Sequence, residues 1–262
     1  MTEPADEAAR SLARLYDLDL VEDPGDLDLY LALAARTGRP ILELAAGTGR
    51  LAVPLAAAGR SVTAVDIDPA MLERARRRAA AAGPAIRDRI EFVVADLIGL
   101  ELPAAGSFGL AFIPLNSLFL LATRDAQREA FRTLARHLAP GGLAVADIWL
   151  PDGEDLARFD GRLILEYERT DPESGELVTK TAAAQHDVAT GVVHLTSIFE
   201  EGRQGGPTRR WIRHDALRLV SAGELQDFAE SAGLAVETLA GGYGLEPIGP
   251  ESDRLILIAE RR

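Results

Sequence analysis

The stretch Ile-Leu-Glu-Leu-Ala-Ala-Gly-Thr-Gly-Arg-Leu, residues 41–51, decides the fold of this chain. A short apolar run ends in a turn of small residues, and the spacing after it predicts a helix over residues 51–58. Strand, tight turn and helix in this order open an α/β nucleotide-type site. Gly47 and Gly49 can adopt positive φ and lack a Cβ, so a ligand could lie directly against the turn. Glu43 is an acid within an apolar strand, which is costly unless a cation or a hydrogen-bond donor meets it.

The glycines alone leave more than one interpretation open. Gly47, Thr48 and Gly49 could form only a close strand-to-helix turn. Residues 47–52 also fit the G-x-G-x-x-G/A pattern of dinucleotide sites. The turn therefore indicates a nucleoside ligand without deciding which one.

Strand and helix patterns alternate beyond this turn. Further strands are expected over residues 61–65, 89–95, 108–115, 143–150, 234–239 and 254–260, and helices over residues 69–82 and 124–138. Such alternation predicts a parallel sheet with helices on both faces. We therefore expect an α/β, Rossmann-like fold with a seven-stranded, mostly parallel sheet.

The pattern changes after Pro151. Four runs separated by short turn sequences predict an inserted antiparallel β meander over residues 163–168, 177–187, 192–201 and 208–220. Ser221, with Glu224 three residues later, then forms a capping box that predicts the start of a helix.

Acidic residues follow two of the predicted parallel strands. Asp66 comes 21 residues after Ala45, close to the offset of about 20 residues at which a strand-end acid meets ribose hydroxyls. Asp68 precedes Pro69 and is expected to cap the next helix. Asp96 follows the third strand and should face the crevice in which ligands of open α/β sheets lie.

Composition excludes several classes of function. The formal net charge of −13 disfavours an extended nucleic-acid or anionic-membrane footprint. Cysteine is absent, which removes thiolate metal sites and thiol nucleophiles, and we expect no metal. Residues 1–7 are acidic and lack a secretory pattern, and no apolar run approaches the roughly 18 residues of a membrane span. A cytoplasmic protein is expected.

These motifs together resemble the class I S-adenosylmethionine-dependent methyltransferases, and most closely the small-molecule branch with glycine N-methyltransferase and the bacterial amino-sugar N-methyltransferases. Residues 43–49 resemble the first motif of that family and residues 65–72 the second. Residues 95–97 correspond to the adenine-side motif, residues 115–118 to the fourth motif, and residues 137–142 to the turn before the fifth strand. The resemblance runs in order from about Tyr16 to Ile148.

The resemblance implies a role for each candidate site residue. S-adenosylmethionine, with S-adenosylhomocysteine as its product, is the implied cofactor, and an acid at Glu43 suits its sulfonium and ammonium better than it suits a pyrophosphate. The implied cofactor-binding residues are Tyr16, Tyr30, Glu43, Ala45, Gly47, Gly49, Asp66, Ile67, Met71, Asp96, Leu97 and Leu115. Asn116, Tyr16 and Trp149 are implied at the reacting centre, although Trp149 could equally be a core residue. Tyr243 could also line the pocket, and Arg50 either reaches the cofactor carboxylate or is solvated.

By the same resemblance, residues 1–40 form a helical lid, 41–150 the cofactor-binding core, 151–220 an antiparallel insertion that covers the substrate or contacts a second copy, and 221–262 the completion of the sheet. The edge strand of the meander could pair with a second subunit, so a homodimer is compatible with the sequence.

The expected activity is direct SN2 transfer of a methyl group to an N or O atom of a small-molecule acceptor, with no nucleic-acid or membrane partner. Relatives often carry a histidine after the fourth strand, but Leu120 occupies that place, which puts a histidine base in doubt. His137 is expected to be structural, and His186, His194 and His214 fall on the meander. A non-catalytic S-adenosylmethionine-binding regulator and a nicotinamide-dependent oxidoreductase remain alternatives.

Overall fold

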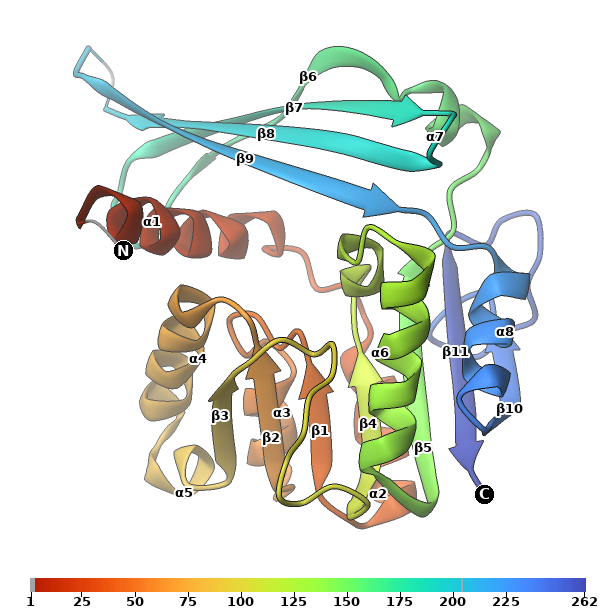
Figure 1. Ribbon diagram of the computed structural model, residues 1–262. Coiled ribbons are helices and arrows are strands. Elements are labelled where there is room, and N and C mark those ends of the chain that lie inside the picture. The colour runs from red at the N-terminus through yellow and green to blue at the C-terminus, as the bar shows by residue number, and fades with distance from the viewer. Residues whose placement is uncertain (1–2, 204) are drawn as a thin grey trace. The chain divides into compact units, whose positions relative to one another are not determined.

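The computed structural model describes residues 3–203 and 205–262. The chain forms two compact units (Figure 1). The first unit runs up to Asp23 and resumes over Pro151–Leu219, and the second comprises Pro24–Leu150 and Val220–Arg262. The segment expected to form a lid, residues 1–40, thus contributes helix α1 to the first unit and helix α2 to the second.

The second unit is built on a seven-stranded sheet with the order β3-β2-β1-β4-β5-β11-β10. Its strands are β1 (Ile41–Leu44), β2 (Val62–Asp66), β3 (Ile90–Val94), β4 (Phe108–Ile113), β5 (Leu138–Trp149), β10 (Leu234–Ala240) and β11 (Arg254–Arg261). The first five are parallel, whereas β11 is antiparallel to both β5 and β10. The expected Rossmann-like, mostly parallel sheet is confirmed. Strand order reverses at β1, between β2 and β4, which is where such sheets bind ligands.

Helices cover both faces of this sheet (Figure 1). They are α2 (Leu27–Thr37), α3 (Ala52–Ala57), α4 (Pro69–Ala82), α5 (Pro84–Arg87), the 3₁₀ helix η1 (Ser117–Leu120), α6 (Arg124–His137) and α8 (Ala222–Ser231). Helices α2 and α3 bury their apolar sides in one core cluster with β1, β2 and β4. On the other face, Phe131 of α6 and Phe228 of α8 pack with ring centroids 6.0 Å apart.

Side-chain caps start several of these helices where the sequence predicts them. Asp68 Oδ1 accepts the N–H of Ala70 at 2.8 Å, so Asp68 caps α4 as expected. Ser221 Oγ accepts the N–H of Glu224 at 3.3 Å, and the Glu224 carboxylate accepts the N–H of Ser221 at 3.4 Å. This reciprocal pair is the predicted capping box.

Replacement of Ser221 by alanine is expected to lower the free energy of unfolding by about 1 kcal/mol, because the Glu224 N–H at the start of α8 loses the hydroxyl that accepts it. Urea titration followed by circular dichroism measures this difference. Ser231→Ala is the matched control, since Ser231 lies at the end of the same helix and its hydroxyl donates only to the Phe228 carbonyl. Equal effects of the two substitutions would contradict the capping role.

The first unit is a four-stranded antiparallel meander with one long helix. It contains α1 (Glu3–Asp19), α7 (Gly153–Ala157), β6 (Asp160–Thr170), β7 (Leu177–Asp187), β8 (Val192–Gly202) and β9 (Thr208–Arg218). The strands pair in sequence order, which confirms the predicted meander. Leu15 and Leu18 of α1 pack on Val178 and Phe199 of the sheet.

An ion-pair cluster fastens α1 to this sheet. The Arg14 guanidinium contacts both Asp171 and Glu201, whose side chains are almost fully buried. Trp211 Nε1 also donates to Glu201 at 2.9 Å. Because buried carboxylates require compensation, this cluster explains why an arginine lies on the sheet-facing side of α1.

Candidate functional site

The glycine-rich turn joins β1 to α3 in an unusual backbone conformation. Ala45, Gly47 and Gly49 all have positive φ, at 58°, 54° and 77°. A Cβ on Gly49 would lie 3.0 Å from the Cβ of Ala75 in α4, so this glycine allows the turn to pack on that helix. Glycine is required here for the backbone conformation and for the close approach of α4, in addition to any ligand contact.

Asp66, at the end of β2, connects the glycine-rich turn to the next strand. Its Oδ2 accepts the N–H of Gly47 at 2.7 Å, and its Oδ1 accepts the N–H of Asp68 at 2.9 Å. Burial raises the pKa of Asp66, and the two backbone N–H groups oppose that shift. The structure therefore brings together the first two motifs, which the sequence predicted to share one ligand.

The remaining residues predicted on the adenosine side lie at the same edge of the sheet. Ile67 directly follows β2 and is 66% exposed, and Met71 is half-buried on α4. Asp96 follows β3 and is exposed, with Oδ1 accepting the N–H of Ile98 at 2.8 Å. Leu97 is half-buried, and its carbonyl accepts the Thr133 hydroxyl. Strands β2 and β3 are parallel neighbours, so their ends present these residues side by side.

Glu43 is buried in β1, with 1% of its surface exposed. Burial raises the pKa of Glu43 to about 8, Arg50 lowers it, and Asp26 and Asp66 raise it further. Its Oε2 atom is buried without a hydrogen-bond partner. A buried acceptor without a partner is costly, so this atom is suited to a cationic or hydrogen-bond-donating ligand.

Arg50 does not resemble a solvated helix-start residue. Its two terminal nitrogens contact both oxygens of Asp26 at 2.6 Å, and Asp26 is fully buried. The sequence left the partner of Arg50 open and missed Asp26, which lies in the acidic segment before α2. Arg50 and Asp26 form a bidentate ion pair near Glu43. Both act on the pKa of Glu43, which Arg50 lowers and Asp26 raises.

Tyr30 lies in the core of the second unit. Its ring is 4.3 Å from that of Phe112, and the side chain is fully buried. Its hydroxyl, like Glu43 Oε2, has no hydrogen-bond partner. Burial, with Asp147, Asp26, Tyr243 and Glu43 contributing, raises the pKa of Tyr30. The hydroxyl is therefore a neutral donor among carboxylates, next to the ends of β1, β4 and β5.

A second polar cluster surrounds the turn after β4. Leu115 and Asn116 have positive φ, at 43° and 62°. Asn116 Oδ1 accepts the N–H of Trp149 at 2.5 Å and a guanidinium N–H of Arg254 at 3.2 Å. Asp147 accepts the N–H of Leu115 at 3.2 Å and the hydroxyl of Tyr243 at 2.9 Å, and it also pairs with Arg254.

The structure therefore joins Asn116, Trp149 and Tyr243, which the sequence selected, and adds Asp147 and Arg254, which it missed. Asp147 is fully buried, with 0% of its surface exposed. Like Glu43, it is an acid inside an apolar strand. An acid inside an apolar strand is a signal that the sequence carries at Asp147 as well, although it does not reveal the partner.

The histidines lie elsewhere. Leu120, at the place of the expected histidine, is 45% exposed. His137 is buried, and its two ring nitrogens have backbone partners. Its Nδ1 donates to the Thr133 carbonyl at 2.8 Å, and its Nε2 accepts the N–H of Leu102 at 3.3 Å. This pattern requires the neutral Nδ1–H tautomer and gives His137 a structural role. Burial lowers the pKa of His137 accordingly. His186, His194 and His214 are in the first unit, and His214 contacts the Thr196 hydroxyl.

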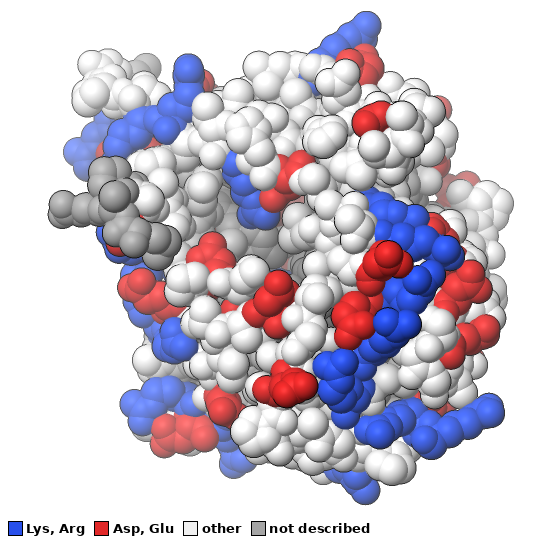
Figure 2. All heavy atoms as spheres, viewed as in Figure 1, with Lys and Arg blue, Asp and Glu red and all other residues white. Residues whose placement is uncertain are grey.

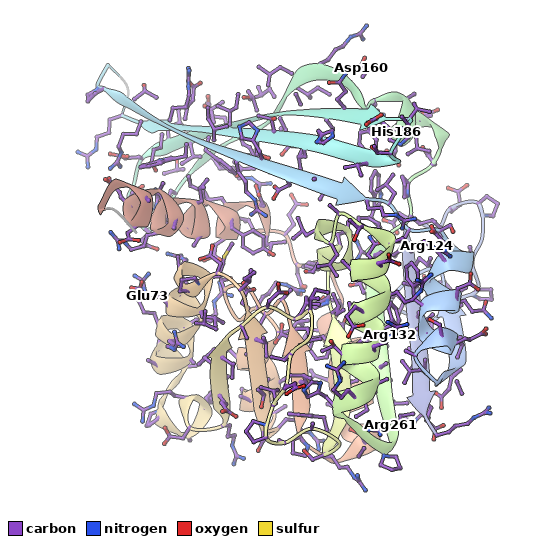
Figure 3. The ribbon with its side chains drawn as sticks, viewed as in Figure 1. Glu73, Arg124, Arg132, Asp160, His186 and Arg261 are labelled. Atoms are coloured by element: carbon purple, nitrogen blue, oxygen red, sulfur yellow. The ribbon has the colours of Figure 1, made fainter. Side chains whose placement is uncertain are left out.

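Figure 3 shows His186 at the end of β7 near Asp160 at the start of β6. The backbone N–H of His186 donates to the Phe159 carbonyl at 3.1 Å. Tyr16 is half-buried on α1, also in the first unit, and its place at the reacting centre stays a prediction.

Among residues 3–203 and 205–262, no three His, Asp or Glu side chains are arranged to bind a metal ion. No helix in the same residues is long and apolar enough to cross a membrane.

The chain is similar to known methyltransferases. The family described as a methyltransferase domain matches residues 41–142. Cypemycin N-terminal methyltransferase from a Streptomyces species is 28% identical over 226 residues, which are 86% of this chain and 84% of that protein. The CcbJ methyltransferase from Streptomyces caelestis superposes with a TM-score of 0.77 and 26% identity, over 92% of this chain and 97% of that chain.

The sugar N-methyltransferase KedS8 from a Streptoalloteichus species shares the fold, with a TM-score of 0.72 and 22% identity over 94% of this chain and 92% of that one. The turn with positive φ, the strand-end acid Asp66 and the Glu43 Oε2 atom, which has no hydrogen-bond partner, are compatible with S-adenosylmethionine as the ligand. The comparisons therefore support an S-adenosylmethionine-dependent methyltransferase, with the methyltransferase domain over residues 41–142.

Proposed function

We propose that this protein transfers a methyl group from S-adenosylmethionine to an amine nitrogen of a small molecule, by direct SN2 displacement. One relative above is named an N-terminal methyltransferase, and another is named a sugar N-methyltransferase. The observation that carries the choice of nitrogen is the state of Asp147. This carboxylate lies beside Asn116, but Arg254, Tyr243 and the Leu115 N–H already occupy it.

An engaged carboxylate is a poor general base, and an amine needs only to be unprotonated to attack a methyl group, whereas a hydroxyl usually benefits from a base. The surroundings of Asn116 therefore favour an amine acceptor over a hydroxyl. Oxygen transfer is the alternative that the experiment below must exclude.

When bound, S-adenosylmethionine supplies a methyl group that is already activated on a sulfonium. The chain itself then has to bind, orient and exclude water. In this proposal Asp66 accepts the ribose hydroxyls, the turn over Ala45, Gly47 and Gly49 contacts the ligand through its backbone, and the Glu43 carboxylate faces the cationic end. Ile67, Met71, Asp96 and Leu97 border the adenosine, and Tyr30 and Leu115 the methionine portion.

Asn116 and Trp149 border the acceptor in the same proposal. Because the protein does little covalent chemistry, the rate depends on the placement of these side chains. A regulator that binds the cofactor without turnover and a nicotinamide-dependent oxidoreductase are not favoured by the comparisons.

Charge at the surface supports a small acceptor rather than a nucleic acid. Figure 2 shows a diagonal row of basic side chains over α6 with acidic side chains on both sides. Arg124, labelled with Arg132 in Figure 3, contacts Glu224 at 3.3 Å, and Arg132 contacts Glu129 at 3.2 Å. This row is neutralised within the chain, and the net charge is −13, so the electrostatic attraction that nucleic-acid binding requires is weak.

A paired panel of acceptors tests the proposal. Purified protein is incubated with S-adenosylmethionine labelled on the methyl group and with amino sugars, amino acids and short peptides, each matched to an analogue in which a hydroxyl replaces the amine. Label in the amines alone supports the proposal. Label only in the hydroxyl analogues would move the activity to oxygen, and S-adenosylhomocysteine binding without any transfer would favour a regulator.

Asn116→Ala is expected to lower the turnover number with such an acceptor by about tenfold or more, with a much smaller change in S-adenosylhomocysteine affinity, because the side chain lies on the acceptor side. Steady-state kinetics and calorimetry on one preparation measure both quantities. Ser117→Ala, one residue further along the same turn, is the control for general disturbance. Wild-type turnover in Asn116→Ala would remove Asn116 from the reacting centre.

A further inference from the structure

We propose that Arg254, bound by Asp147 and Tyr243, is a positioning residue that fixes the Leu115–Asn116 turn on strand β5 and thereby sets the acceptor-side wall of the methyl-transfer site. The proposal rests on the proposed function, which places Asn116 beside the acceptor. It starts from an ionic cluster formed by the turn after β4, the end of β5 and the start of β11.

The turn requires an external constraint. Leu115 and Asn116 are consecutive residues with positive φ, a conformation that costs side-chain-bearing residues roughly 1–2 kcal/mol each. Leu115 is poorly suited to it, whereas asparagine tolerates it better. Such a conformation persists only where contacts with the surrounding structure hold the backbone in place.

The constraint comes from β5. The Leu115 N–H donates to the Asp147 carboxylate at 3.2 Å, and the Asn116 N–H donates to the Asp147 carbonyl at 3.1 Å. In return, Asn116 Oδ1 accepts the Trp149 N–H at 2.5 Å. Three hydrogen bonds thus join two residues of the turn to two residues of one strand.

Arg254 connects both sides of this junction. One terminal nitrogen contacts Asp147 and the other donates to Asn116 Oδ1 at 3.2 Å. The planar fork of arginine can reach two acceptors in this way, whereas lysine offers a single compact ammonium. Asp147 is fully buried and requires a cation, so the same guanidinium both neutralises the carboxylate and fixes the Asn116 side chain.

Tyr243 completes the assembly from the loop between β10 and β11. Its hydroxyl donates to Asp147 at 2.9 Å, and Arg254 lies 5.5 Å from the centre of its ring. The loop is packed tightly around this tyrosine, because a Cβ on Gly242 would lie 1.8 Å from Glu246 Oε1. The antiparallel end of the sheet therefore supplies two side chains that act on the turn after a parallel strand.

Arg254 acts through Asn116 and is not itself a catalytic residue. Displacement of a group by about 1 Å can lower a rate by as much as a hundredfold, so a loosened turn would affect turnover before it affects folding. This distinguishes Arg254 from an arginine that contributes only to stability.

The test compares Arg254→Lys with Arg254→Met and with the control Arg261→Lys. The lysine variant retains a cation beside Asp147 but loses the fork, and the methionine variant loses both. Arg261 lies at the other end of β11, where it contacts the Leu138 carbonyl and not the turn (Figure 3). Hydrogen exchange of peptides covering residues 114–120 and 147–150, S-adenosylhomocysteine calorimetry, thermal unfolding, and kcat and KM with the amine acceptor are measured for each.

For Arg254→Lys we expect exchange in these peptides to be about tenfold faster, while exchange elsewhere and the unfolding temperature stay near wild type. The same variant should lower kcat by about tenfold to a hundredfold, with cofactor affinity within about threefold of wild type. Arg261→Lys should change neither measurement.

Wild-type exchange at residues 114–120 in both Arg254 variants would overturn the proposal, and so would faster local exchange with unchanged kcat. Loss of folding in Arg254→Met leaves Arg254→Lys to decide. If wild-type protein methylates no amine, the proposed function fails, whereas the exchange experiment still reports whether Arg254 fixes the turn.

Discussion

Asp66→Ala is expected to bind S-adenosylhomocysteine about 100-fold more weakly than the wild-type protein. Hydrogen bonds to a charged group contribute about 1.5–3 kcal/mol each, and two ribose hydroxyls donating to one carboxylate would lose about 3 kcal/mol together. Part of the lost affinity comes from the glycine-rich turn. The Asp66 carboxylate also accepts the N–H groups of Gly47 and Asp68, and the variant loses both hydrogen bonds. Isothermal calorimetry on protein with a verified unfolding transition measures the effect.

Two controls separate the ribose contribution from the effect on the turn. Asp68→Ser retains a capping side chain for α4 and should leave ligand affinity near wild type. The 2′-deoxy analogue of S-adenosylhomocysteine should bind wild-type protein more weakly than the parent compound, and this difference should disappear in Asp66→Ala, which has no side-chain acceptor for the ribose hydroxyl. Intact affinity in folded Asp66→Ala would remove Asp66 from the site.

Glu43→Gln is expected to stabilise the ligand-free protein by an amount that grows with pH. Burial raises the pKa of Glu43 from an ordinary value of 4.5 to about 8. Between these two values the folded state binds a proton that the unfolded state has released, so the stability of wild-type protein falls as pH rises. Glutamine remains neutral and lacks this dependence. The difference between the two proteins should grow by up to about 1.4 kcal/mol per pH unit between about pH 5 and pH 8.

Urea titrations at about pH 5, 6.5 and 8 measure this difference. Glu91→Gln is the matched control, because Glu91 is an exposed carboxylate of β3 and its replacement changes the net charge by the same amount. Parallel stability curves for wild-type protein and Glu43→Gln would show that Glu43 is not a buried, proton-binding carboxyl group.

The same variant tests the proposed contact between Glu43 and the cationic end of S-adenosylmethionine. A cationic sulfonium near the carboxyl group favours its ionised form, so the affinity of wild-type protein for S-adenosylmethionine should rise with pH more steeply than the affinity for uncharged-sulfur S-adenosylhomocysteine. Glu43→Gln should abolish this difference between the two ligands. A difference that persists in the variant would place the sulfonium away from Glu43.

Much of the fold is encoded locally, and the sequence therefore predicted it. Apolar runs, the turn over residues 45–49 and the caps at Asp68 and Ser221 each depend on neighbouring residues alone. They fixed the order of elements, the mostly parallel sheet and the separate meander. The positions of Asp66 and Asp96 followed as well, because parallel strands present their carboxyl ends at one edge.

Side-chain partners could not be predicted in this way. The sequence showed that Glu43 needed a partner and that Asn116 follows a strand, but Arg50 pairs with Asp26 across 24 positions and Arg254 with Asp147 across 107. It placed Tyr30 beside the ligand, whereas the structure also shows its ring packed on Phe112 in the core. Periodicity identifies which face of an element is buried, while the identity of a buried partner depends on sheet order and on the register of β11 against β5. The sequence alone thus determined which acidic and small residues lie at one edge of the sheet, where we propose that the ligand binds. Only the tertiary structure decided which charges meet there, because those contacts join segments that no local pattern connects.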